Sequence, residues 1–135
     1  MHSKVDLGCG SYKKAGYYGI DIDEHPGVDL VYNLNEGIPL PTGSVDELFS
    51  QHSLEHFQNP LFILDEIYRV CSDHARIEIT VPLYQVWQPD HITCFYEDWF
   101  ERNALMFNVL EKRITKTHDA QERTIDQLTV VLGKK

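Results

Sequence analysis

Short apolar segments separated by polar turns run along most of the chain and predict β-strands. The expected strands are residues 4–7, 17–21, 28–32, 45–50 and 76–81, followed by 109–116 and 124–132. Pro82 stops the fifth strand because proline has no N–H to donate to a sheet. The last two strands lie close together in the sequence, so we expect them to form an antiparallel pair at the edge of the sheet.

Two helices are predicted between the later strands. Asn59-Pro60 is typical of a helix start, since asparagine can accept a bond from a free amide and proline fits the first helical position. Residues 97–105 predict a second, shorter helix. The apolar face of the first helix is expected to carry Leu64, Ile67, Tyr68 and Cys71.

The links between the first three strands are too short for crossover helices. A helix that joins two parallel strands needs about ten to twelve residues. Residues 9–16 and 22–27 are shorter than that, and few residues precede the first strand. Arg76, Glu78 and Thr80 also alternate with apolar neighbours, which is typical of a sheet with one exposed face. We therefore expect an α/β fold with a mostly parallel seven-stranded sheet, an antiparallel edge hairpin and reduced helices on one face. That helix-poor face is either solvated or the interface of a possible homodimer.

Composition and charge narrow the class of protein. The chain has 135 residues, 42% of them hydrophobic and 24% charged, which predicts a single globular domain over residues 1–135. A net charge of −9 opposes binding to nucleic acid or to an anionic membrane. Cys9, Cys71 and Cys94 are an odd number at wide spacings, so we expect reduced thiols rather than disulfides. No apolar run is long enough to cross a bilayer, and the expected location is cytoplasmic.

Acidic residues and glycines follow the first two strands. Asp6, Gly8 and Gly10 lie at the end of the first strand, and Asp21 ends the second. Ligands of open parallel sheets bind at this carboxyl edge, and a carboxylate can accept two hydrogen bonds from a ribose diol. The pattern predicts a nucleoside-bearing ligand. A nicotinamide dinucleotide is disfavoured because its fingerprint needs a third glycine at position 13, which is lysine here.

Several segments together resemble class I S-adenosylmethionine-dependent methyltransferases of the small type-11-like group. They are residues 5–10, 19–23, 33–34, 38–41, 44–50, 54–56, 63–70 and 80–82, in the family's order over roughly residues 4–98. The resemblance implies a single Rossmann-like methyltransferase domain that uses S-adenosyl-L-methionine. It implies methyl transfer to an oxygen or nitrogen of a small-molecule or sugar acceptor. The alternative is an S-adenosylmethionine- or S-adenosylhomocysteine-binding interaction module with little activity of its own.

The same resemblance implies a set of cofactor-binding residues. Asp21 would take the ribose hydroxyls, Ile22 would pack on the adenine, and the amide oxygen of Asn33 would accept from the adenine amino group. Ser11-Tyr12 departs from the family, which often has a third glycine there. The full expected set is Asp6, Gly8, Cys9, Gly10, Asp21, Ile22, Asn33, Leu34, Gln51 and His52.

The candidate for catalysis is His91, in the loop after the fifth strand. An imidazole titrates near neutral pH and can take a proton from an acceptor hydroxyl. The equally weighted alternative is that Asp90 and His91 only brace the loop. Tyr84 and Trp87 are candidates for an acceptor pocket, whereas Phe95, Tyr96 and Trp99 are better explained as core.

The pair Glu55-His56 permits two interpretations. Some members of the resembled family hold a divalent ion with such a pair and a second glutamate one helical turn earlier. Here that earlier position is Gln51, which has no charge. We therefore favour local hydrogen bonds at a helix start and expect no metal site.

Overall fold

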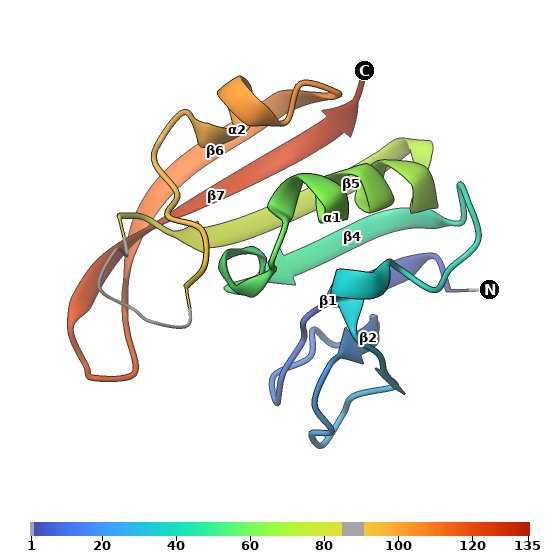
Figure 1. The fold of residues 1–135 in the computed structure, drawn as a ribbon, viewed down its shortest axis with the longest axis horizontal. Helices are drawn as coiled ribbons and strands as arrows, with labels where there is room; N and C mark the ends of the chain where they lie inside the picture. Colours follow the sequence, from blue (N-terminus) through green and yellow to red (C-terminus); the bar gives the residue numbers. More distant parts are fainter. Residues whose placement is uncertain (1, 85–90) are drawn as a thin grey trace.

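A seven-stranded sheet forms the centre of the computed structural model, which describes residues 2–84 and 91–135 (Figure 1). The strands lie in the order β3-β2-β1-β4-β5-β7-β6. Strands β1 to β5 pair with one another in parallel, and β7 runs antiparallel to both β5 and β6. The bounds are β1 (Lys4–Leu7), β2 (Tyr18–Asp21), β3 (Leu30–Val31), β4 (Val45–Gln51), β5 (Cys71–Pro82), β6 (Phe107–His118) and β7 (Thr124–Lys134). The predicted mostly parallel sheet with an antiparallel edge hairpin is confirmed.

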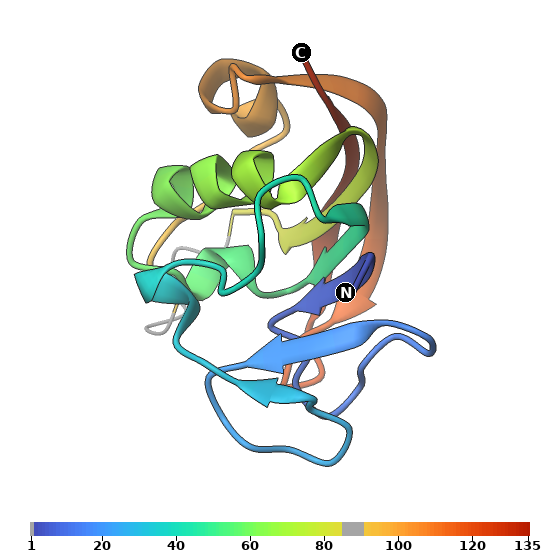
Figure 2. The same cartoon turned by 90° about the vertical axis from the view of Figure 1, so that its right-hand side faces the viewer.

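The helices pack on one face of this sheet. They are α1 (Pro60–Val70), α2 (Trp99–Asn103) and the short 3₁₀ helices η1 (Leu34–Glu36) and η2 (Leu54–His56). Figure 2 shows them on the same side of the sheet. The α1 helix begins as predicted, because the Asn59 side chain accepts hydrogen bonds from the amides of Leu61 and Phe62. Its buried side chains are Ile63, Leu64, Ile67 and Val70.

Some element bounds differ from the prediction. β5 begins at Cys71, directly after α1, so residues 71–75 are strand rather than connection. β3 is reduced to Leu30–Val31, and α2 to Trp99–Asn103. Local patterns set where an element lies, but pairing with neighbouring strands sets its length, and pairing was not visible in the sequence.

The opposite face of the sheet has no helix among residues 2–84 and 91–135, as expected from the short links. Its side chains are largely polar and paired with one another. Thr80 and Thr129 lie opposite each other in register and share a buried hydrogen bond of 2.8 Å. Arg76 forms ion pairs with Glu78 at 3.1 Å and Glu111 at 3.7 Å. The reduction of helices on one face is therefore confirmed.

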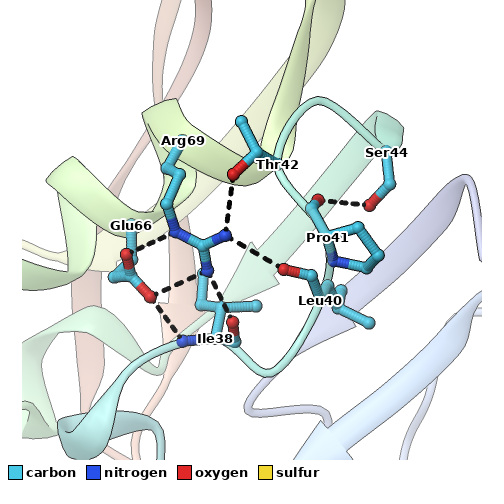
Figure 3. Close-up of polar contacts among 7 residues, drawn as sticks. All are labelled: Ile38, Leu40, Pro41, Thr42, Ser44, Glu66 and Arg69. Carbon is cyan, nitrogen blue, oxygen red and sulfur yellow. Dashed lines mark hydrogen bonds and ion pairs between the residues drawn. The ribbon is translucent and has the colours of Figure 1, made fainter.

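An ion pair on α1 holds the loop that follows η1 (Figure 3). The Arg69 guanidinium bonds the Glu66 carboxylate at 2.8 Å and donates to the carbonyl oxygens of Ile38 at 2.8 Å and Leu40 at 3.1 Å. Glu66 in turn accepts from the Ile38 amide at 2.9 Å. These bonds lower the pKa of Glu66. Because the loop continues from η1, the clamp also positions residues 33–36 at the sheet edge.

Two further features are the length of the helices and the state of the cysteines. None of the helices in the described part of the chain has the length and apolar character needed to cross a membrane. Cys9, Cys71 and Cys94 are free thiols, as predicted. Burial raises the pKa of Cys71 to about 12 and that of Cys9 to about 11, so neither is poised as a thiolate nucleophile.

Candidate functional site

A cavity of about 440 Å³ lies at the carboxyl edge of β1, β2 and β4. This volume falls in the range of about 300–1,000 Å³ that is usual for small-molecule sites. Four segments form its walls: the turn after β1, the end of β2, the residues around η1 and the residues around η2. The lining residues are Gly8, Gly10, Asp21, Ile22, Asp23, His25, Asn33, Leu34, Asn35, His52, Ser53, His56 and Phe57.

Asp21 is held in place at this edge by two backbone amides. Its Oδ2 accepts from the Gly10 amide at 2.8 Å, and its Oδ1 accepts from the Asp23 amide at 2.9 Å. Each carboxylate oxygen can accept a further bond, so both keep acceptor capacity for a ligand. The carboxylate is therefore preoriented by the protein and does not need a ligand to order it.

The two glycines after β1 serve different purposes. Gly8 has φ +67°, and a Cβ there would collide with the Ser53 side chain, so glycine is needed for packing as well as for the turn. Gly10 has φ +55°, and no heavy atom lies within 4 Å of the position that a Cβ would take. The expectation that glycine permits close approach of a ligand thus fits Gly10, while the close neighbour of Gly8 is Ser53.

The end of the cavity near η1 combines an apolar surface with a fixed amide. Ile22 is 55% exposed, which leaves its side chain open to the cavity. Asn33 caps η1, and its Oδ1 already accepts from N and Nδ2 of Asn35 at 3.0 and 3.2 Å. A bond from an adenine amino group to this oxygen would therefore have to replace one of these local bonds.

A second cavity, of about 520 Å³, lies on the other side of the turn after β1. Asp6, Phe49 and Gln51 line it, and their register places them on the helix-free face. Asp6 is only 2% exposed, and burial raises the pKa of its carboxyl to about 6, although the Lys14 amide donates to Oδ2 at 2.9 Å. Thr117 and His118 of β6 also line this cavity.

Each of the ten predicted cofactor-binding residues lines at least one of these two cavities. Gly8 and His52 line both. Asp6, Cys9 and Gln51 line only the cavity on the helix-free face. The residues that line only the first cavity are Gly10, Asp21, Ile22, Asn33 and Leu34.

Sequence reasoning missed part of the first cavity. Asp23 and His25 continue the alternation begun by Asp21 beyond β2, and this spacing was the available signal. Ser53 and Phe57 gave no signal, because only the path of the chain through η2 brings them to the cavity.

The predicted catalytic residue, His91, is half-buried and lies beside η2. Its ring packs edge-on against that of His56, with centroids 4.9 Å apart. His56 lines the first cavity, so His91 contacts a residue of the cavity wall without being one of the lining residues. Tyr84 is 49% exposed, with φ +58°. Phe95 and Trp99 are core as expected, but the prediction was wrong for Tyr96, which is 37% exposed. Trp87 and Asp90 fall outside the described residues.

The donors and surfaces of the first cavity fit an adenosyl compound. Asp21 offers carboxylate oxygens for a diol, Ile22 offers an apolar surface for a flat base, and the open space at Gly10 admits a close ligand. Binding of such a compound by these residues stays a prediction.

Comparison with known proteins agrees with this geometry. The family model described as a methyltransferase domain matches residues 5–79, which is more than half of the chain. No curated protein sequence matches the chain.

Solved structures share the fold at low sequence identity. An S-adenosylmethionine-dependent methyltransferase from Methanosarcina mazei aligns with a TM-score of 0.73 at 16% identity, over 99% of this chain and 94% of that one. A chain from the complex of the Haloferax volcanii Trm112 methyltransferase activator with a methyltransferase aligns with a TM-score of 0.72 at 16% identity. The alignment covers 96% of this chain and 82% of that one. The [4+2]-cyclase SpnF aligns with a TM-score of 0.78 at 14% identity, over 98% of this chain and 75% of SpnF.

These structural similarities establish the fold, and the match to the family model establishes the family. It spans β1 to β5 and therefore includes every strand that borders the first cavity. The chain belongs to the methyltransferase-domain family, and its cofactor is S-adenosyl-L-methionine.

Proposed function

We propose that this protein transfers the methyl group of S-adenosyl-L-methionine to an oxygen or nitrogen of a small-molecule or sugar acceptor. The observation that supports it is the 440 Å³ cavity whose wall carries the preoriented Asp21 carboxylate. When bound, the cofactor supplies a methyl group activated by its cationic sulfur. The chain has to bind the cofactor, orient the acceptor within about 3–3.5 Å and receive a proton where the acceptor carries one.

In this proposal, two ends of the first cavity have separate roles. Asp21, Ile22 and the residues around η1 bind the nucleoside. His52, Ser53, His56 and Phe57, which lie from the residue after β4 to the residue after η2, form another part of the wall, and we assign this part to the acceptor. Imidazoles are concentrated there, since His91 contacts His56. A neutral imidazole at this place can accept the acceptor's proton, which is the role predicted for His91.

One observation favours the alternative, a cofactor-binding module with little activity of its own. No helix covers the second cavity among the described residues, so Asp6 and Gln51 face a cavity open to the helix-free side. One structural neighbour was solved in a complex with a methyltransferase activator, and another is a cyclase. A partner that covers the second cavity would then complete the site.

A homodimer through the helix-free face is the partner arrangement that we propose for that case. Ion pairs such as those of Arg76 can exchange for equivalent pairs across a twofold axis. Solution scattering at micromolar concentration measures the mass directly, and the mass of a single protomer would exclude this arrangement. Exclusion of nucleic acid as an acceptor, based on the charge of −9, also stays a prediction.

Calorimetric titration with S-adenosylhomocysteine tests the proposed cofactor site. We expect a single-site isotherm that weakens when Asp21 is replaced. A screen for loss of the methyl donor over small hydroxyl and amine acceptors then separates the enzyme from the binding module. Binding without turnover of any acceptor supports the module, and absence of binding overturns both.

A further inference from the structure

A buried carboxylate lies among imidazoles at the turn after β4. The Glu55 side chain is 1% exposed, although glutamate is rarely buried. Its Oε2 lies 3.7 Å from Nε2 of His56 and 4.0 Å from Nδ1 of His52. One ligand atom from each of Glu55, His56 and His91 lies within 4.8 Å of the other two.

Two separate segments of the chain hold this group together. Glu55 and His56 belong to η2, whereas His91 comes from beyond β5. The amides of Ile92 and Thr93 donate to the backbone carbonyl of Glu55 at 2.8 and 3.2 Å, which ties the His91 segment to η2. The cluster is thus a product of the fold and not of neighbouring sequence positions alone.

His52 supports the group from the end of β4. Its Nε2 lies 2.7 Å from Oε1 of Gln127, and Nε2 of Gln127 donates to Thr115 at 3.1 Å. The second bond orients the Gln127 amide so that its oxygen accepts from His52 Nε2. The other ring nitrogen of His52, Nδ1, lies on the side of Glu55. The bond to Gln127 thus fixes the ring orientation of His52 beside the Glu55 carboxylate.

From this geometry we infer that Glu55, His56 and His91 form a binding site for a divalent transition-metal ion. One carboxylate oxygen and two imidazole nitrogens suit zinc, cobalt or iron(II), whereas magnesium and calcium prefer oxygen ligands. Ligands of one zinc ion lie about 2.0–2.2 Å from it, so small side-chain rotations bring atoms within 4.8 Å to bonding positions. The expectation of no metal site relied on the uncharged Gln51, whereas this inference takes the third ligand from His91.

The position of the site gives the ion a role, and this part of the inference rests on the proposed function. His56 lines the first cavity, so coordination positions left open by the three ligands are accessible from the acceptor end. An ion held by these residues would supply Lewis-acid chemistry: it would lower the pKa of an acceptor hydroxyl, whose proton would pass to solvent. The oxygen then forms a bond to the methyl carbon as the bond from carbon to sulfur breaks. His91 acts as a ligand in this state, in place of the proton acceptor predicted from the sequence.

Asp21, Asp23 and His25 form a rival group with ligand atoms within 4.8 Å of one another. The Asp21 carboxylate there already accepts from two backbone amides, and all three residues line the part of the cavity assigned to the nucleoside. The test must therefore separate the two groups.

The experiment is a titration of the metal-free, untagged full chain with Co²⁺, followed by visible absorption and by calorimetry. We expect one site per chain, with absorption bands typical of mixed nitrogen and oxygen coordination. His56→Ala and His91→Ala should each weaken Co²⁺ binding by more than about 100-fold, since even loss of an outer partner costs 10–100-fold. The exposed His74→Ala is the matched control and should bind like wild type.

The other results of the titrations either support or overturn the proposed metal site. Absence of Co²⁺ binding, or binding that is lost in His25→Ala and kept in His56→Ala, overturns the inference. His56 has a side chain 41% exposed, so its variant is expected to fold even if Glu55→Gln does not. Titration with S-adenosylhomocysteine runs in parallel: a chain that binds Co²⁺ but not this compound keeps the metal site and loses the proposed function. A chain that binds S-adenosylhomocysteine but not Co²⁺ keeps the proposed function and loses the metal site.

Discussion

The backbone amide of Gly10 donates a hydrogen bond of 2.8 Å to the carboxylate of Asp21, which joins the turn after β1 to the end of β2. The amide and the carboxylate are therefore both parts of one rigid wall of the first cavity. A ligand that bonds Asp21 meets a group whose orientation has already been fixed during folding, which lowers the entropy cost of binding.

Replacing Asp21 with alanine should weaken binding of S-adenosylhomocysteine by about 1–3 kcal/mol, because the ribose hydroxyls lose their acceptors. Calorimetric titration measures the change. Asp73→Ala is the control, since that side chain is 91% exposed and is not among the residues that line either cavity. Equal affinity in Asp21→Ala and wild type would show that the nucleoside binds elsewhere.

Asp6 should make the protein less stable as the pH rises from about 4 to about 6. Burial raises the pKa of its carboxyl from 3.8 to about 6, so the folded protein binds a proton in this range that the unfolded chain releases. The stabilisation by this group is complete below pH 3.8 and is lost as the pH rises through about 6. Well above pH 6, the ionised form costs about 3 kcal/mol, of which about 2 kcal/mol is lost between pH 4.5 and pH 7.

Denaturant unfolding at pH 4.5 and pH 7 tests this dependence. In Asp6→Asn, the difference between the two free energies of unfolding should shift by about 2 kcal/mol in favour of pH 7. The amide oxygen of asparagine can still accept from the Lys14 amide, so that bond need not be lost. An unchanged difference would contradict the raised pKa.

Arg69→Met should lower the free energy of unfolding by about 1–3 kcal/mol. The substitution leaves Glu66 without its cation and removes donors from the Ile38 and Leu40 carbonyls, while the methionine keeps most of the aliphatic packing. Urea denaturation measures the loss. Arg102→Met is the control: it removes an exposed pair with Asp98, and such pairs contribute little. A loss no larger than that of the control would show that the clamp is not stabilising.

Asn59→Ala should destabilise the protein by about 1 kcal/mol, because the Leu61 and Phe62 amides at the start of α1 lose their acceptor. Asn59→Asp keeps an acceptor oxygen at the cap, and the added negative charge is favourable at a helix N-terminus. We expect this variant to match or exceed wild type in thermal unfolding. Equal destabilisation in both variants would assign the effect to something other than capping.

Local signals in the sequence were sufficient for much of the fold. Asn59-Pro60 predicted the first residue of α1, and the alternation around Ile77 predicted a sheet with one helix-free face. The short links 9–16 and 22–27 allowed only turns. These features depend on a few consecutive residues and on backbone sterics, so they can be recognised without knowledge of the partners.

The chain alone determined the residues at the ends of β1 and β2, because turn geometry and strand endings are written in consecutive positions such as Asp6, Gly10 and Asp21. The tertiary structure alone decided that Ser53 packs against Gly8 and that His91 joins Glu55 and His56. Those contacts connect segments far apart along the chain. Their geometry follows from how β4, β5 and η2 pack, which no local pattern encodes.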